Sequence, residues 1–357
     1  MILLSHLISE FADALRVRFA PRLLPGHERA LTAMQQCRTE HSPVLVVRCA
    51  ACGQVETLPH SCGHRNCPHC QHHEGQQWLE RQRAKLLPVD YFMVTFTLPR
   101  QLRPLAWQHQ RLIYDLLLKL GWQTLSDFGL NDPRLKGKIG AHAVLHTHSR
   151  RLDFHPHVHF IIPAGALDTK HRLWRRKNGT YLFHEGNLAK VFRAKWFQAL
   201  KDEGLKVCST IPKDWVVDCQ HVGRGDQALT YLGKYLYRGV LQEKDILSCN
   251  NGEVTFRYTD NTGKSKTRTL DGPAFLWLLL QHVLPKGFRR ARDYGFLHSN
   301  SKPLIQLLQY LFHCVAHPPP QKRPKPPIPC KACGGIMEII ATRIRQLPEP
   351  IPKLQPI

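Results

Sequence analysis

Hydrophobic residues recur every three or four positions along several stretches of the chain, which is the spacing of one buried helix face. Over the first 36 residues this spacing predicts two short helices, separated by Pro21 and Pro25. The same spacing predicts further helices over residues 72–87, 104–128, 187–203, 226–238 and 273–284. Helical segments are therefore expected along most of the chain.

Strands are predicted where β-branched and aromatic residues concentrate. The stretches are residues 91–98, 141–147, 157–163, 215–219, 253–258 and 266–270. Residues 149–153 would connect the second and third strands as a hairpin, and residues 260–263 would connect the last two. Residues 37–70 hold glycines, prolines and six cysteines, which favours a turn-rich knuckle rather than a packed sheet.

Composition and charge narrow the class of partner. The chain of 357 residues is 43% hydrophobic, so it can bury a core, and its net charge of +23 favours a polyanionic partner such as nucleic acid. No stretch is long and apolar enough to span a membrane, and residues 1–4 lack the basic start of a signal peptide. We expect a cytoplasmic, nucleoid-associated protein without a membrane partner, whose 12 cysteines bind metal or stay as thiols.

Two Cys-x-x-Cys pairs lie in the turn-rich segment, Cys49 with Cys52 and Cys67 with Cys70. Each pair can present two thiolates to one ion, and the two pairs together can complete a tetrahedral site. We expect these four cysteines to bind one structural Zn²⁺, because a site filled by thiolates leaves no position for a substrate. The basic side chains on the DNA-contacting surface that this ion would order are Arg65, Arg81, Arg83 and Lys85.

The other cysteines near these pairs and near the carboxyl end leave alternatives open. Cys37 and Cys62 could form a second metal site or replace one of the four expected ligands. Cys330 and Cys333 follow a stiff stretch rich in proline and lysine, and they form half a knuckle. They are either thiols without metal or half of a zinc site, and the residues that could complete that site are Cys314, His313 and His317.

A histidine pair lies in an apolar stretch that is predicted to be a strand. His157 and His159 are two positions apart, so their imidazoles project from the same face of the strand. Two imidazoles side by side form half of a divalent metal site, and a buried polar group needs such a partner. Gln227 and His221 are the rival third ligands. The preceding strand carries further histidines that could support the ligands or lie at the surface, namely His142, His146 and His148.

A tyrosine pair follows about seventy residues later. Tyr231 and Tyr235 are four positions apart, so on the predicted helix their phenols share one face with Gln227. A phenolate can attack a phosphate that a divalent cation has polarised, which gives a covalent 5′-phosphotyrosine. A second tyrosine can accept a second strand while the energy of the bond is kept. The basic chain, the histidines and the tyrosines together indicate phosphodiester chemistry.

These motifs resemble those of the IS91-type transposases, which are part of the HUH endonuclease superfamily. The strand motif is HPHVHFIIP at residues 155–163, and the helix motif is YLGKY at residues 231–235. Further similar stretches are residues 61–71, 91–99, 213–217, 282–288 and 292–295. The resemblance covers roughly residues 25–300 in the same order.

The resemblance implies an α+β fold, with a central antiparallel sheet and flanking helices as in HUH nucleases, preceded by a helical zinc-binding module. It implies a transposase that acts on single-stranded element ends and target DNA by rolling-circle-like transposition. His157, His159 and a third polar side chain would hold Mg²⁺ or Mn²⁺, Tyr231 would be the essential nucleophile and Tyr235 the second tyrosine. Host replication or helicase proteins are candidate partners.

Changes in composition divide the chain into three expected domains. Residues 1–88 would form the helical, zinc-binding and DNA-contacting domain, and residues 89–298 the catalytic domain. Residues 299–357 would add a helix, the Pro/Lys-rich linker and the tail with its Cys-x-x-Cys pair.

Two other functions fit part of the pattern. A non-catalytic zinc-ribbon regulator of DNA would account for the charge and the cysteines, but not for the histidine and tyrosine pairs. A metal hydrolase that uses water as its nucleophile would account for the histidines alone.

Overall fold

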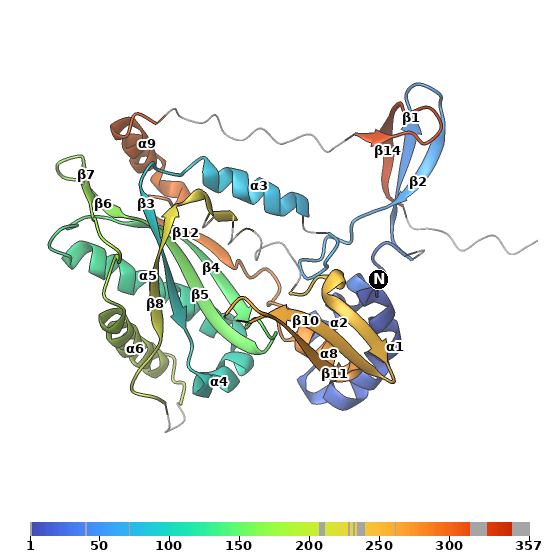
Figure 1. Cartoon of the computed structure of the whole chain (residues 1–357), viewed down its shortest axis with the longest axis horizontal. Helices are drawn as coiled ribbons and strands as arrows, with labels where there is room; N and C mark the ends of the chain where they lie inside the picture. The colour runs from blue at the N-terminus through green and yellow to red at the C-terminus, as the bar shows by residue number, and fades with distance from the viewer. Residues whose placement is uncertain are drawn as a thin grey trace, which may run out of the picture.

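The computed structural model describes residues 2–39, 41–70, 72–206, 211–227, 229–230, 233, 240–260, 262–314 and 327–344. Its largest sheet has five antiparallel strands in the order β12-β4-β5-β3-β8 (Figure 1). These strands are β3 (Asp90–Thr97), β4 (Gly140–His148), β5 (Phe154–Pro163), β8 (Val217–Arg224) and β12 (Ala291–Gly295). The expected central antiparallel sheet is confirmed. β12 was not predicted, because its short sequence ARDYG holds a single aromatic residue and no β-branched one.

Two helices cover one face of the central sheet, α5 (Gln110–Asn131) and α6 (Glu185–Asp202). Their apolar residues share a buried cluster with Phe96 of β3 and Phe160 of β5. Gly121 allows the close approach of α5, because a Cβ at that position would lie 2.7 Å from the Phe160 ring. The chain enters α5 through two short helices, η2 (Arg100–Leu102) and α4 (Arg103–Gln108).

The opposite face of the central sheet is covered by α3 (His72–Arg83) and α9 (Lys302–Leu311). Residues from both helices join Val144 and Ile161 of the sheet in a second buried cluster, which also includes Leu229. A Cβ added at Gly233 would lie 3.5 Å from Leu79 of α3. Leu229 and Gly233, which follow β8, therefore lie over this face. Tyr231 and Tyr235 lie outside the described residues.

A third unit joins the amino-terminal helices to a much later part of the chain. α1 (Leu4–Phe19), α2 (Pro25–Gln35) and α8 (Gly272–Leu280) share a core with a three-stranded sheet in the order β11-β10-β9. Its strands are β9 (Ile246–Asn250), β10 (Glu253–Thr259) and β11 (Ser265–Asp271). The predicted hairpin of β10 and β11 is confirmed, whereas β9 was not predicted. Phe19 stacks on Trp277 with ring centroids 4.9 Å apart, so α1 and α8 are held together.

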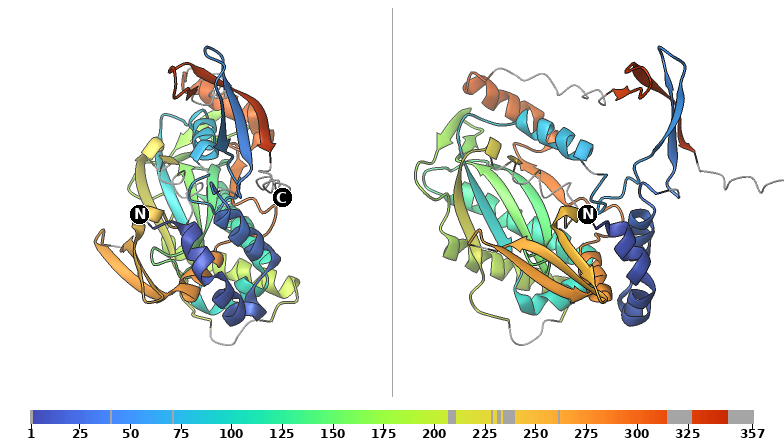
Figure 2. Two further views of the ribbon diagram at one scale, coloured as in Figure 1. Left: turned by 90° about the vertical axis from the view of Figure 1, so that its right-hand side faces the viewer. Right: turned by 45° about the vertical axis from the view of Figure 1, so that its right-hand side comes forward.

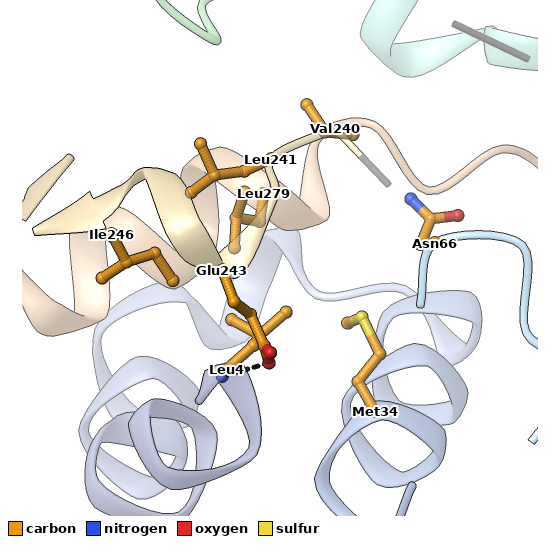
Figure 3. Close-up of a pocket in the computed structure, with 8 residues that line it drawn as sticks. All are labelled: Leu4, Met34, Asn66, Val240, Leu241, Glu243, Ile246 and Leu279. Carbon is orange, nitrogen blue, oxygen red and sulfur yellow. Dashed lines mark hydrogen bonds between the residues drawn. The ribbon is translucent and has the colours of Figure 1, made fainter. Parts of the chain in front are cut away.

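A small apolar cavity lies inside this third unit (Figure 3). Among the described residues that line it, Glu243 in the short helix η3 (Glu243–Asp245) is the ionisable one. The buried Glu243 carboxylate accepts a hydrogen bond of 2.7 Å from the backbone N–H of Leu4, and its other oxygen lies 3.1 Å from Nε2 of His69. Glu243 therefore ties the start of α1 to the loop that carries Cys67 and Cys70, which makes this cavity part of the structural core.

A separate four-stranded sheet, in the order β13-β14-β1-β2, projects from the rest of the molecule (Figure 2). We call it the ribbon. β1 (Val44–Cys49) and β2 (Val55–Pro59) form a hairpin, and β13 (Ile328–Pro329) and β14 (Ile336–Ile344) come from the other end of the chain. The expectation of a turn-rich knuckle without a packed sheet is wrong here. β1 gains its second neighbour, β14, only when the two ends of the chain meet.

Elements from the three segments predicted from the sequence pack against one another. α1 of the first segment packs on α8 of the second, α9 of the third packs beside α3 of the first, and β14 pairs with β1.

The remaining elements are η1 (Ala20–Arg22), β6 (Gly165–Asp168), β7 (Leu173–Arg176) and η4 (Ser299–Ser301). Among the described helices, none is both long and apolar enough to cross a membrane.

Candidate functional site

Three histidines meet on the face of the central sheet that α3 and α9 cover. His157 and His159 lie on β5 with Val158 pointing to the opposite core, as their spacing predicted. His146 of β4 is the register partner of His157, so its ring projects from the same face. One ring nitrogen from each of the three lies within 4.8 Å of the other two. We call this cluster the histidine triad.

Hydrogen bonds orient two rings of the triad. Nδ1 of His157 lies 2.7 Å from the backbone carbonyl oxygen of His155, and since a carbonyl can only accept, this nitrogen carries the proton and donates. Nδ1 of His159 lies 2.9 Å from Oγ1 of Thr95 on the neighbouring strand β3. Both contacts use Nδ1, which leaves the two Nε2 atoms for a ligand. Metal-binding histidines are commonly held in this way.

Burial keeps the triad neutral. Loss of solvent lowers the pKa of His157 to about 4. Burial, with a smaller contribution from the neighbouring histidines, also lowers the pKa values of His146 and His159 well below the usual range. At neutral pH the three rings therefore carry no charge and offer lone pairs, which is the form that binds a metal ion.

The third histidine of the cluster, His146, is neither of the two rival third ligands that the sequence offered, Gln227 and His221. His221 pairs with Phe92 across β3 and β8, and their rings lie 5.3 Å apart. Phe92 belongs to the core under α5 and α6, so His221 faces the side of the sheet away from the triad, and its prediction as a ligand is wrong. Gln227 is exposed, with its amide oxygen near Gly223. Sequence spacing could not select His146, because its place beside His157 depends on the register of β4 against β5.

The segment that leads to Tyr231 is anchored over the triad face. Asp226 accepts a hydrogen bond of 2.7 Å from Nε of Arg83 on α3, and Leu229 is buried against that helix. These contacts lie at the start of the helix predicted over residues 226–238, one face of which would carry both phenols. The tyrosines themselves are outside the described residues, so it stays a prediction that their phenols lie close to the triad.

A second polar group lies on the same face of the sheet. Asp293 of β12 accepts a hydrogen bond of 2.7 Å from Nδ1 of His142 on β4, and Nζ of Lys85 lies 2.5 Å from its other oxygen. The contacts with His142 and Lys85 outweigh the effect of burial and hold the pKa of Asp293 well below its usual range. This pair of contacts joins the end of α3 to the edge of the sheet.

A groove of about 460 Å³ opens beside the carboxyl end of α4. Its walls combine arginines with aromatic rings, and the lining residues are Arg22, Arg100, Arg103, Pro104, Trp107, Gln108, Phe154, Trp277 and Gln281. Trp107 meets Trp277 and Phe154 edge to face, with ring centroids 5.4 and 5.5 Å away. The guanidinium of Arg103 contacts Nδ1 of His155, two positions before His157. We call this the basic groove; its arginines and rings suit a phosphate backbone and stacked bases.

Eight of the described cysteines form two clusters of four, whereas the sequence predicted one site of four cysteines and left a second site open. Cys67 and Cys70 meet Cys37 and Cys62, while Cys49 and Cys52 meet a different pair. That pair is Cys330 and Cys333, from the other end of the chain. The predicted site of Cys49, Cys52, Cys67 and Cys70 is therefore wrong in its grouping. The cause is the hairpin: Cys49 and Cys52 lie at its tip, and the five residues of β2 carry the chain away from them by about 3.4 Å each.

The Cys37–Cys70 cluster is compact and fixed to the body of the protein. Its sulfur atoms lie 3.4 Å apart for Cys37 and Cys70 and 3.7 Å apart for Cys62 and Cys70. Arg65 and Asn66, inside the same loop, donate hydrogen bonds to the backbone oxygens of Phe288 and His282.

The basic residues expected to contact DNA near this cluster mostly have partners inside the protein. Arg65 donates to Phe288, Arg83 pairs with Asp226 and Lys85 pairs with Asp293. These three side chains hold elements together in the structure.

Two family models match the chain. One, described as "Transposase zinc-binding domain", matches residues 7–98, and the other, described as "Putative transposase", matches residues 140–303. The first segment contains the Cys37–Cys70 cluster, and the second contains His146, His157 and His159.

Two curated proteins are similar over most of their length. The chain is 30% identical to "Putative transposase y4qJ" of Sinorhizobium fredii over 347 residues, which covers 90% of this chain and 87% of that protein. It is 27% identical to "Transposase for insertion sequence element IS801" of Pseudomonas savastanoi pv. phaseolicola over 350 residues, with 86% and 82% covered. No solved structure matches the chain.

Proposed function

The chain belongs to the IS91-type transposases, which carry an amino-terminal zinc-binding domain, and from this premise we propose that it nicks and rejoins single-stranded DNA at the ends of an insertion element. The reaction is rolling-circle-like transposition through a 5′-phosphotyrosine. Its catalytic domain is an HUH-type nuclease, an assignment supported by two histidines on the central strand of an antiparallel sheet.

The proposed chemistry exchanges one ester for another. The phenol oxygen of Tyr231 loses its proton and attacks the scissile phosphorus, and the O3′ atom of the preceding nucleotide leaves and takes up a proton. The products are a 5′-phosphotyrosine ester and a free 3′ hydroxyl. Tyr235 takes the second strand in the same way. Because the ester keeps the energy of the broken bond, rejoining needs no ATP.

The histidine triad is the observation that carries this proposal. A divalent ion held by His146, His157 and His159 would polarise the scissile phosphate. The donor set fits such an ion, because all three nitrogens are neutral and lie within 4.8 Å of one another. Imidazole donors suit Mn²⁺ better than Mg²⁺, which prefers oxygen ligands. We therefore propose Mn²⁺ first, and His146 in place of Gln227 as the third ligand.

The basic groove gives the single strand a path toward the triad. Arg100 and Arg103 would contact phosphates, and Trp107 offers a partly exposed ring for a base. Arg103 also contacts His155, whose carbonyl orients His157. A strand lying in the groove would thus reach β5 beside its metal-binding residues. Target DNA and host replication proteins are further partners in this proposal.

Zinc has a structural role in the proposed enzyme. The four thiolates of Cys37, Cys62, Cys67 and Cys70 would fill the coordination shell and leave no position for a substrate. His69, between Cys67 and Cys70, contacts Glu243 and so connects this site to α1. The ion would hold the amino-terminal helices against the catalytic sheet.

The test uses end-labelled single-stranded DNA of the element's terminus, incubated with the full-length protein and Mn²⁺ and resolved on a denaturing gel. We expect a covalent protein–DNA adduct that requires the metal and disappears in Tyr231→Phe and in His157→Ala. The matched controls are Tyr310→Phe and His6→Ala, at exposed positions of α9 and α1, which should keep the adduct.

Each other function has its own outcome in this assay. Free 5′-phosphate products without an adduct would indicate the metal hydrolase. Binding of the labelled strand without any cleavage would indicate the zinc-ribbon regulator. An adduct that persists in Tyr231→Phe would remove Tyr231 from its assigned role.

A further inference from the structure

We propose that Cys49, Cys52, Cys330 and Cys333 bind a second structural Zn²⁺, which joins the amino-terminal hairpin to the carboxyl-terminal strands. The matched zinc-binding segment ends at residue 98, so half of these ligands lie outside it. The proposed ion is separate from the one at Cys37–Cys70 and does not depend on the catalytic assignment.

The two halves of this site have the same local structure. Each is a Cys-x-x-Cys-Gly turn, and its glycine has a positive φ, 74° at Gly53 and 75° at Gly334. The hydrogen bonds are also equivalent. The N–H of Gly53 donates to the oxygen of Cys49 (3.0 Å), as that of Gly334 does to Cys330 (2.8 Å).

A second pair of backbone contacts repeats the equivalence. The N–H of Cys49 donates to the oxygen of Gln54 (2.8 Å), and that of Cys330 donates to the oxygen of Gly335 (2.7 Å). Two matching turns that face each other present two sulfurs each to one point, which is how paired knuckles bind a tetrahedral ion.

The sulfur positions fit a shared ion and not a disulfide. Sγ of Cys49 lies 3.5 Å from Sγ of Cys333, and Sγ of Cys52 lies 3.7 Å from Sγ of Cys330. A disulfide requires about 2.05 Å. Four sulfurs at about 2.3 Å from a central Zn²⁺ are about 3.8 Å from each other in a tetrahedron. The observed separations are close to that edge length.

The ribbon lacks a core that could hold these cysteines without metal. Its buried cluster consists of Val47, Cys49, Cys330 and Met337, so two of its four members are proposed ligands. Sheets this small usually need a metal or a disulfide to fold. Since β1 is hydrogen-bonded to both β2 and β14, an ion here fastens the two ends of the described chain together (Figure 1).

The first test counts metal in the full-length protein. We expect the Cys330→Ser/Cys333→Ser variant to contain one zinc fewer per chain than the wild type, measured by mass spectrometry of the metal after dialysis. Cys249→Ser/Cys314→Ser is the matched control, because it also removes two thiols and both lie outside the two clusters. Equal zinc in the wild type and the Cys330/Cys333 variant would overturn the proposal.

A second measurement uses the wild-type protein, so its result does not depend on whether a variant folds. Replacement of zinc by Co²⁺ gives sulfur-to-metal charge-transfer absorption in proportion to the number of bound thiolates. We expect eight bound thiolates in the wild type, four at each cluster. A value of four would overturn the second site, and iron absorption in the protein as purified would overturn the choice of zinc.

Discussion

The histidine triad and the ribbon hold their proposed metal ligands in place in different ways. The triad lies on β4 and β5, inside a five-stranded sheet that has a buried cluster on each face, and two of its rings are oriented by hydrogen bonds, His159 with Thr95 and His157 with the carbonyl oxygen of His155. The ribbon has a buried cluster of four residues, two of which are cysteines of the proposed site. A sheet with its own core can hold ligands before an ion arrives, whereas a ribbon without one depends on the ion for its shape.

The difference indicates how each ion is used. The proposed ion at the triad would meet three protein nitrogens, which would leave coordination positions open for a phosphate. The proposed ion in the ribbon would meet four thiolates and have no open position. Removal of the ion at the triad should therefore abolish nicking without unfolding the protein. Removal of the ion in the ribbon should unfold the ribbon and leave the central sheet folded.

The largest effect is expected from His146→Ala. Loss of a ligand that helps to stabilise transition-state charge should lower the rate of adduct formation by on the order of 10³-fold. Single-turnover assays with labelled single-stranded DNA and Mn²⁺ would measure it, with circular dichroism to show an unchanged fold. His221→Ala is the control, because its ring lies on the other face of the sheet. The reverse result, with His221 essential and His146 dispensable, would contradict the triad.

Chelation of zinc should affect the two regions differently. Hydrogen exchange followed by mass spectrometry should show that amides of β1 and β14 lose protection when the metal is removed, because their small core cannot hold them. Amides of β4 and β5 should keep their protection, since the described residues of their two buried clusters include none of the cysteines proposed to bind zinc. Simultaneous loss in both regions would mean that the ribbon and the central sheet unfold as one unit.

A smaller effect is expected from Thr95→Val. The change removes the hydroxyl that lies 2.9 Å from Nδ1 of His159 and leaves a side chain of similar shape. Loss of such an orienting hydrogen bond typically weakens metal binding by about 10–100-fold. Isothermal titration with Mn²⁺ would measure the change. Thr255→Val on β10, where the hydroxyl contacts the hydroxyl of exposed Thr269, should leave the affinity unchanged. An unaltered affinity in Thr95→Val would show that His159 needs no such support.

The smallest effect is expected from Arg100→Gln in the basic groove. With one phosphate contact fewer, the slope of log affinity for single-stranded DNA against log salt should become shallower by about 0.7. Fluorescence anisotropy at several salt concentrations would measure it, and metal content should stay the same. Arg134→Gln, in the loop between α5 and β4, is the matched control. Equal slopes in both variants would place the DNA path elsewhere.

Most strands of the central sheet could be predicted from the sequence, because each shows the residue pattern of a strand. The alternation that puts His157 and His159 on one face and Val158 on the other is visible in a few residues, and the structure confirms it. β12 and β14 were not predicted. β12 is short and polar, and β14 pairs with β1, which lies far away in the chain.

The sequence by itself determined which kinds of ligand are available: imidazoles on an apolar strand, thiols in Cys-x-x-Cys turns and paired phenols in a basic chain. The tertiary structure alone decided which of them lie together. His146 joins His157 because β4 and β5 pair in one register, and Cys49 joins Cys333 because β14 returns beside β1. Ligand type is a property of single residues, whereas ligand grouping depends on contacts between strands that no local pattern encodes.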